Sequence, residues 1–133
     1  MRIRPFIIVF VAILLVAGLG YVWAEDVITG SAAWYGLEDT RKIHDPPMNS
    51  NGTLFDENAL TCAMRSRDFG KYYKVTNLAN GKSVIVQHVD FGPAIWYRGR
   101  FLNRVMDLSK HAFSLIADLD TGVIKVKIER VSE

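Results

Sequence analysis

The chain has 133 residues, of which half are hydrophobic and 23% are charged, so it can bury one small core. Arg2 and Arg4 account for the formal net charge of +2, and after Ala24 the basic and acidic residues balance. A neutral domain lacks the general attraction to phosphate that nucleic-acid binding needs, so we expect no nucleic-acid partner. A neutral polymer such as a glycan is compatible with this charge.

The N-terminal segment is typical of an export signal. Arg2 and Arg4 precede an uncharged apolar run at residues 6–23, and Ala24 ends a small-residue cleavage site. We predict a signal peptide or signal anchor at 1–24, a linker at 25–29 and one domain at 30–133. The run is just long enough to span a bilayer as a hydrophobic helix, so an uncleaved anchor is the alternative to cleavage. Because the basic residues stay inside, the domain is exported to the periplasm, cell envelope or exterior, and this segment is its only membrane contact.

The first predicted strand covers residues 30–36, where Trp34 and Tyr35 point to opposite faces. Residues 37–58 are rich in turn-forming residues, so we expect a long irregular loop that is either disordered or part of a binding surface. A short apolar strand follows at 59–64. It contains Cys62, the only cysteine, which excludes an internal disulfide and is expected to be buried.

Residues 71–93 predict a β-hairpin around which the domain is organised. Tyr73 and Val75, then Val84 and Val86, alternate with polar neighbours, as half-buried strands do. Asn80-Gly81 between them favours a two-residue turn. The second strand delivers Asp90 to a break at Gly92-Pro93, because proline cannot continue a central strand.

The rest of the chain predicts a loop, a helix and a closing strand. The loop at 91–104 carries Trp96, Tyr97 and several arginines, and an apolar run follows at 105–108. Ser109 can cap a helix through Ile116. In the strand at 123–131, apolar and lysine side chains alternate. Widely spaced strands with one helix indicate a small closed β-barrel.

Four blocks resemble the double-psi β-barrel domain of the rare lipoprotein A (RlpA) type. They read GSAAWYG, NSNGTLFDENALTCA, KVTNLANGKSVIVQHVDFGP and GRFLNRVMDLSKHAF, in order, over about residues 30–131. The resemblance implies a mainly β fold, a six-stranded double-psi barrel with one short helix, in an exported protein directed at peptidoglycan. Members studied as enzymes are lytic transglycosylases, which are carbon–oxygen lyases. Similar barrels occur in expansins, which loosen wall polysaccharide without cutting it.

The chain departs from the family pattern at two positions. The family commonly reads T-A-A-H in the second block, where Met64 replaces the histidine, and D-R-G-P in the third, where Phe91 replaces the arginine. Asp90 and the D-L-S beginning at Asp107 are retained. The substitution at Met64 favours the alternative of a non-catalytic, expansin-like glycan-binding or wall-loosening module.

A lytic transglycosylase can work with one carboxyl group, which protonates the leaving oxygen and then accepts the proton of the sugar's own 6-hydroxyl. We predict Asp90 in this role, with a pKa raised by burial or by a nearby acid, for which Asp107 is the candidate. The alternative is that Asp90 only stabilises the turn at Gly92-Pro93. His88 lies two residues earlier, so on a regular strand it would share the face of Asp90 and could orient it.

Aromatic and arginine side chains are the predicted substrate contacts. A flat ring suits the apolar face of a sugar, and guanidinium groups suit the carboxylates of peptidoglycan. The candidates are Trp34, Tyr35, Tyr97, Arg98 and Arg100. No spacing of His, Asp or Glu indicates a metal site, so we predict no metal and no cofactor. We expect a monomer whose partner is peptidoglycan or a related polysaccharide.

Overall fold

The computed structural model describes residues 27–94, 96–97, 99–101 and 103–131, together with three two-residue strands nearer the N-terminus. Side chains are described from Val27 onward, except at residues 95–98, 101–102 and 132–133. The long strands are β4 (Val27–Tyr35), β5 (Thr61–Met64), β6 (Tyr72–Asn77), β7 (Ser83–Phe91), β10 (Arg104–Ser109) and β11 (Val123–Val131).

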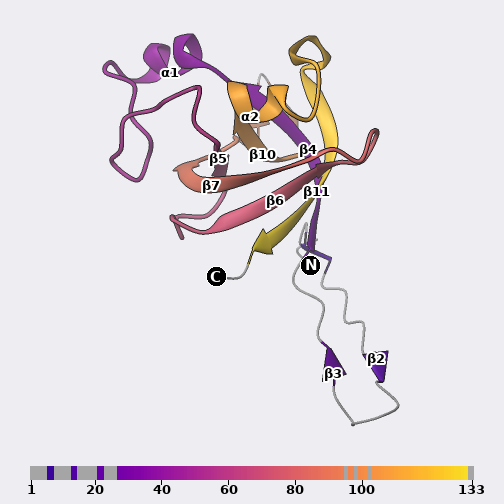
Figure 1. Ribbon diagram of the computed structural model, residues 1–133. Helices are drawn as coiled ribbons and strands as arrows, with labels where there is room; N and C mark the ends of the chain where they lie inside the picture. Colours follow the sequence, from indigo (N-terminus) through magenta and orange to yellow (C-terminus); the bar gives the residue numbers. More distant parts are fainter. Residues whose placement is uncertain are drawn as a thin grey trace.

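These six strands close into a mixed barrel (Figure 1). Their order is β4-β10-β5-β7-β6-β11, and β11 pairs again with β4. The pairs β4–β10 and β5–β7 are parallel, and the other four are antiparallel. Closure leaves no long strand edge unpaired. The predicted six-stranded barrel of mainly β class is therefore confirmed.

The core fills the barrel with the inward side chains of each strand. On β11, Ile124, Val126 and Ile128 are buried, while Lys125 is exposed, as the alternating pattern predicts. Val75 and Val86 are buried on the hairpin strands. Cys62 is also fully buried, and burial raises the pKa of its thiol, so the thiol is kept protonated and unreactive.

The predicted hairpin is confirmed, but its turn is longer than expected. β6 and β7 pair in register, with Val75 opposite Val84. The connection includes Asn80-Gly81, where Gly81 has a φ of 75°, and its amide donates to the Asn77 carbonyl. The Asn77 amide donates in turn to the Lys82 carbonyl. The prediction of a two-residue turn was therefore wrong.

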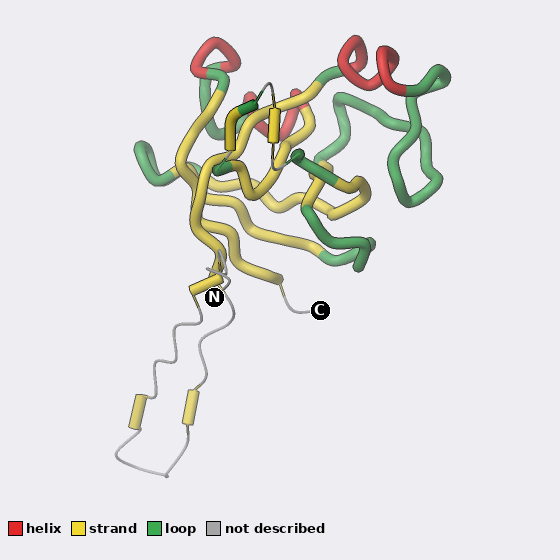
Figure 2. The backbone as a smooth tube through the Cα atoms, turned by 180° about the vertical axis from the view of Figure 1, so that it is seen from behind, coloured by secondary structure: helices red, strands yellow, loops and turns green. Residues whose placement is uncertain are grey.

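One helix was predicted and one was missed. Helix α2 (Lys110–Ser114) begins after Ser109, whose side chain accepts from the Ala112 amide, so the predicted cap is confirmed. Helix α1 (Leu37–Ile43) lies within the segment expected to be irregular. Both helices lie toward the same end of the barrel (Figure 2). A third, short 3-10 helix, η1 (Leu119–Thr121), precedes β11.

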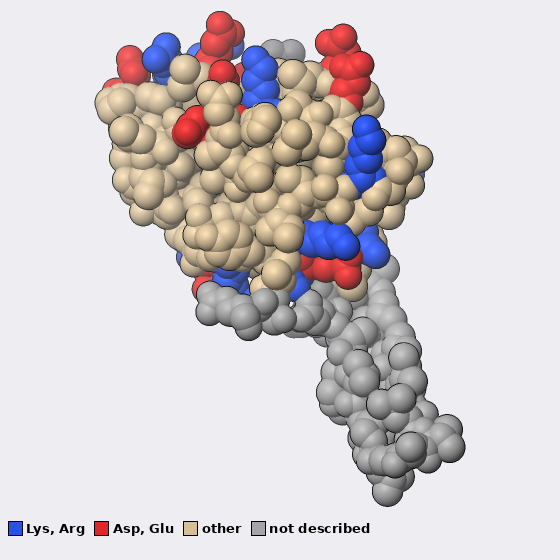
Figure 3. Space-filling view, in the orientation of Figure 1, with Lys and Arg blue, Asp and Glu red and all other residues tan. Residues whose placement is uncertain are grey.

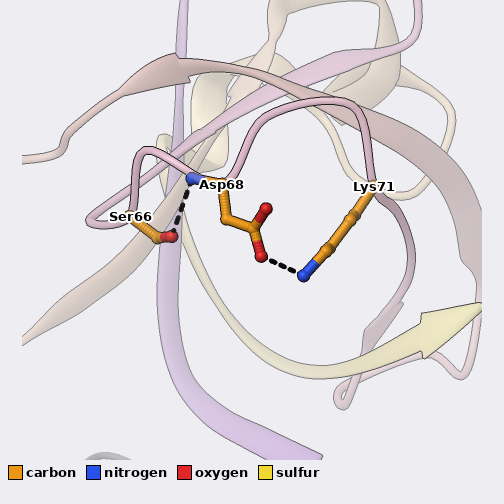
Figure 4. A network of polar contacts seen from close by, with 3 residues as sticks. All are labelled: Ser66, Asp68 and Lys71. Atoms are coloured by element: carbon orange, nitrogen blue, oxygen red, sulfur yellow. Dashed lines mark hydrogen bonds and ion pairs between the residues drawn. The ribbon is translucent and has the colours of Figure 1, made fainter.

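The loop between β5 and β6 is held by its own polar contacts (Figure 4). Ser66 Oγ accepts from the Asp68 amide at 3.1 Å, and the Lys71 ammonium binds the Asp68 carboxylate. Elsewhere the surface is mixed: the face in Figure 3 is largely uncharged, with basic and acidic side chains interspersed around it. This distribution agrees with the balanced charge after Ala24.

The predicted signal peptide or anchor falls mostly outside the described residues. The six residues described within 1–24 form β1 (Phe6–Ile7), β2 (Ile13–Leu14) and β3 (Tyr21–Val22) rather than a helix. β1 pairs with β4, and β2 pairs with β3. None of the helices in the described part of the chain has the length and hydropathy needed to span a bilayer.

Two further two-residue strands, β8 (Trp96–Tyr97) and β9 (Arg100–Phe101), pair within the loop before β10.

Candidate active site

Two aspartates lie in one row across three neighbouring strands. Ala63 of β5 pairs with Asp90 of β7 on one side and with Asp107 of β10 on the other. Asp107 is also in register with Ala33 of β4. Residues in such a row point to the same face, and alanines leave space above the sheet. The fold therefore places the carboxyl groups of Asp90 and Asp107 on the same face of the sheet, next to the small side chains of Ala33 and Ala63.

This row forms one wall of an open pocket of about 330 Å³. That volume is in the range of small-molecule sites. The barrel contributes Tyr35 and the turn after Asp90 to the lining, and α1 with the segment that follows it contributes the rest. The lining residues from α1 and that segment are Asp39, Thr40, Ile43, His44, Met48 and Ser50.

Asp90 is held by three hydrogen bonds to one oxygen. Its Oδ1 accepts from the Ser50 amide at 2.9 Å, from Ser50 Oγ at 2.6 Å and from the Phe91 amide at 2.9 Å. The strand ends at Phe91, and Gly92 follows with a φ of 148°, which suits glycine. The other oxygen, Oδ2, accepts no hydrogen bond from the described residues, so it is the one available to a ligand.

Asp107 is the more deeply placed of the two acids. Burial raises the pKa of its carboxyl to about 6, against the lowering effect of Arg104 and Arg65, and the charge of Asp90 raises it further. Its Oδ1 is buried and makes no hydrogen bond within the described part of the chain. A carboxyl group in this state retains a proton in mildly acidic solution, as a general acid must.

Tyr35 presents its hydroxyl to the same two acids. Its ring stacks on Phe55, with centroids 4.8 Å apart. Burial, then the nearby charges led by Asp90, raises the pKa of the phenol, so it remains protonated. The hydroxyl is buried and makes no hydrogen bond of regular geometry with the described residues, although Asp90 is near enough to affect it. Among the described residues it is therefore a proton donor without an acceptor at regular hydrogen-bond geometry.

His88 does not share the face of Asp90, because the strand is irregular between them. Cys62 pairs with His88 and Ala63 pairs with Asp90, so β7 contains one extra residue, a β-bulge, at this point. The imidazole is fully buried, 5.0 Å from the Phe69 ring. Its Nε2 lies 2.9 Å from the Asp90 main-chain carbonyl, so the ring contacts the backbone of Asp90 rather than its carboxylate.

The other predicted contacts lie in different places. Trp34 packs on the core, and its Nε1 donates to the Leu119 carbonyl at 3.0 Å, so it does not line the pocket. Arg100 is exposed on β9, also outside the pocket lining. The side chain of Tyr97 and all of Arg98 lie outside the described residues. Met64, where the family pattern has histidine, belongs to the core cluster.

Several pocket residues were missed by sequence reasoning. Phe91 is 47% exposed at the pocket, and the Arg67 guanidinium lies over its ring, 4.4 Å from the centroid. Phe91 and Arg67 therefore form an aromatic and cationic pair beside the pocket, while the prediction for Tyr97 and Arg98 stays untested. Ser50 and His44 were not predicted as site residues, because they lie in a segment whose apolar residues show no helical or strand periodicity. The described residues contain no group of three potential metal ligands.

Comparisons with known proteins agree with this fold. Residues 27–128 match the model of a double-psi β-barrel family described as "Lytic transglycolase". An endolytic peptidoglycan transglycosylase RlpA of Neisseria meningitidis is 39% identical over 108 residues, which cover 81% of this chain and 41% of the relative. The same enzyme of Pseudomonas aeruginosa is 36% identical over 104 residues, covering 78% of this chain and 27% of the relative. The chain thus spans less than half the length of these curated relatives.

Solved structures share the fold at lower identity. The Streptomyces papain inhibitor superposes with a TM-score of 0.58 at 22% identity, covering 80% of this chain and 94% of that chain. An expansin of Clavibacter michiganensis has a TM-score of 0.58 at 21% identity, covering 80% of this chain and 51% of that chain. At these identities the likeness concerns the barrel and not the chemistry.

Proposed function

Since this chain belongs to the lytic transglycolase family of double-psi β-barrels, we propose that it cleaves the glycan strands of peptidoglycan by lytic transglycosylation. The observation that carries this proposal is the row that brings Asp90 and Asp107 to one open pocket. Curated relatives that share the domain are named as endolytic peptidoglycan transglycosylases, which supports the same substrate class.

The two acids divide the proton chemistry according to their surroundings. Asp107 retains a proton up to a pH of about 6, and Asp90 keeps one oxygen open to the pocket. The pair therefore carries an exchangeable proton for the glycosidic oxygen as the bond to C1 breaks. The 6-hydroxyl of the same sugar then bonds to C1 and releases its proton. In the minimal scheme the acid pair accepts that proton at the open oxygen of Asp90.

The remaining predicted residues support this pair in different ways. His88 is a positioning residue, because it contacts the main-chain carbonyl of Asp90. Tyr35 is a substrate contact, since its buried hydroxyl makes no hydrogen bond of regular geometry with the described residues. Phe91 with Arg67 offers an apolar ring and a cation at the pocket rim, which suits a sugar bearing a carboxylate. Trp34, Tyr97, Arg98 and Arg100 stay candidates for a longer binding surface.

The proposed substrate requires export. Residues 1–24 fit a signal peptide or anchor, and peptidoglycan lies outside the cytoplasmic membrane, so we place the domain in the cell envelope. Fusion of residues 1–30 to a reporter that is active only after export tests this location. Activity would support it, and activity that persists after Arg2 and Arg4 are replaced by Glu would argue against a charge-directed signal.

Product analysis tests the proposed reaction. The purified full chain is incubated with peptidoglycan sacculi, and released sugars are examined for anhydro ends by mass spectrometry. The wild-type protein should release them, and Asp90→Asn should not, while binding to sacculi persists in both. Binding without anhydro products from the wild type would instead support a non-catalytic, expansin-like module, the alternative that Met64 in the core favours.

A further inference from the structure

A histidine beside the two acids offers a second proton-transfer group. His44 follows α1 and lines the same pocket as Asp90 and Asp107. It is exposed to solvent. No other described histidine lines the pocket. His88 is a buried residue of β7, and Met64 occupies the family's histidine position in the core. One imidazole therefore lines the pocket together with three carboxyl groups, those of Asp90, Asp107 and Asp39, the last of which accepts from the Gly36 amide at 2.9 Å.

The main chain fixes the tautomer of this imidazole. The Nδ1 of His44 lies 2.7 Å from the carbonyl oxygen of Pro46. A carbonyl oxygen can only accept a hydrogen bond, so Nδ1 must carry the proton. In the neutral ring Nε2 then has a free lone pair and is the basic nitrogen. In histidines that act as bases, a hydrogen bond from Nδ1–H to a main-chain carbonyl often sets the tautomer in this way.

The backbone also holds the ring in position. The amide of His44 donates to the Thr40 carbonyl at 3.0 Å, which ends α1. The start of α1 is fixed in turn, because Glu57 accepts from the Leu37 amide at 2.8 Å. A side chain held at its amide and at Nδ1 has fewer rotamers open to it, which restricts the positions that Nε2 can take.

We propose that His44 is a catalytic residue of the proposed transglycosylation and accepts the proton of the 6-hydroxyl at Nε2. The inference depends on the proposed function and replaces the second step of the minimal scheme. The acid pair gives its proton to the glycosidic oxygen as the C1–O bond breaks, and the 6-hydroxyl oxygen bonds to C1. Its proton moves to Nε2, and the imidazolium later returns a proton to the carboxylate through solvent. No co-reactant is needed.

Two substitutions separate this role from a structural one. His44→Asn keeps a donor close to the Nδ1 position and can still bind the Pro46 carbonyl, whereas His44→Gln places an amide near the Nε2 position. Neither side chain can accept a proton. His111→Gln is the matched control, because His111 is exposed on α2 and does not line the pocket.

Initial rates of anhydro-sugar release from sacculi give the decisive result. Both His44 variants should lose about 100-fold in kcat, the lower range for general acid–base catalysis, with KM changed less than about twofold. His111→Gln should match the wild type. Retention of half or more of kcat by either His44 variant, or a loss confined to KM, would overturn the inference. A wild type that releases no anhydro ends would overturn both this inference and the proposed function.

A second measurement does not depend on activity. Nitrogen chemical shifts of 15N-histidine-labelled protein should report the Nδ1–H tautomer for His44. Titration with an oligosaccharide of N-acetylglucosamine, such as chitotetraose, should shift Nε2 of His44 and leave His111 unchanged. The opposite tautomer, or an Nε2 that is insensitive to saturating oligosaccharide, would contradict the proposed role.

Discussion

Asp90 on β7 and Asp107 on β10 are separated by a single residue of the sheet, Ala63, with which both are in register. Their backbones are therefore two strand spacings apart, about 10 Å. The short side chain of Ala63 leaves the space between them open, and both line the pocket. Burial raises the pKa of Asp107, and the charge of Asp90 raises it further.

The raised pKa of Asp107, which is due first to burial and only in part to Asp90, predicts a pH-dependent cost of folding. Its folded pKa of about 6 lies above the ordinary value of 3.8, so the folded chain holds the proton more tightly than the unfolded chain. The contribution to the free energy of unfolding is complete below about pH 4 and is lost as the pH rises through about 6. At most, about 3 kcal/mol is lost over this window.

Asp107→Asn removes the titrating group and should flatten this dependence. Urea unfolding at several pH values between 4 and 7 measures it. The stability of the wild type relative to the variant should fall as the pH rises. A constant difference across the window would mean that Asp107 has an ordinary pKa in the folded chain. The same variant should lose activity in the anhydro-sugar assay, since it cannot supply a proton.

Ser50 is expected to orient Asp90 rather than to take part in the reaction. Its hydroxyl donates to Asp90 Oδ1 at 2.6 Å and accepts from the Phe91 amide at 3.3 Å. Ser50→Ala removes both contacts but leaves the hydrogen bond from the Ser50 amide. We expect kcat to fall about tenfold, with a loss of stability of about 1 kcal/mol. Unchanged kcat would show that the main-chain donors suffice.

The hairpin, α2 and the closing strand could be predicted because their determinants are local. Ser109 precedes its helix and caps it, and the alternation on β11 reflects one buried face. Helix α1 could not be predicted, because its start depends on Glu57, twenty positions later, and only Thr40 in it is buried. The apolar residue at its end, Ile43, is 88% exposed. A helix without an apolar face has no periodic signal.

The candidate site was predicted only where local sequence features determine the position of a residue. Asp90 stands at a strand end marked by Gly92-Pro93, so its sequence context identifies it. The face of His88 was not predictable, because the bulge between it and Asp90 arises from pairing with β5, and a one-residue slip reverses the face. Ser50 and His44 come from a segment whose path is set by tertiary contacts, so nothing in their spacing indicates the pocket.

Phe91 should contribute to glycan affinity through its exposed ring. The Arg67 guanidinium stacks on this ring, and Phe91 lines the pocket. Phe91→Ala should weaken binding of chitotetraose about tenfold, because an aromatic contact contributes on the order of 1 kcal/mol. Ile85→Ala is the control, since Ile85 is 50% exposed on the same strand but does not line the pocket. Equal affinities of the two variants, measured by calorimetry, would exclude Phe91 as a binding platform.

Tyr35 should show opposite effects on stability and on binding. Its hydroxyl is buried without a regular hydrogen bond, and an unsatisfied buried hydroxyl costs on the order of 1–3 kcal/mol. Tyr35→Phe removes that hydroxyl and keeps the ring that stacks on Phe55 at 4.8 Å. The variant should therefore be at least as stable as the wild type in urea unfolding. It should also bind chitotetraose less tightly, because the donor that a sugar oxygen would satisfy is gone. A less stable variant would mean that the hydroxyl is bonded within the folded chain, and an unchanged affinity would mean that it does not contact the glycan.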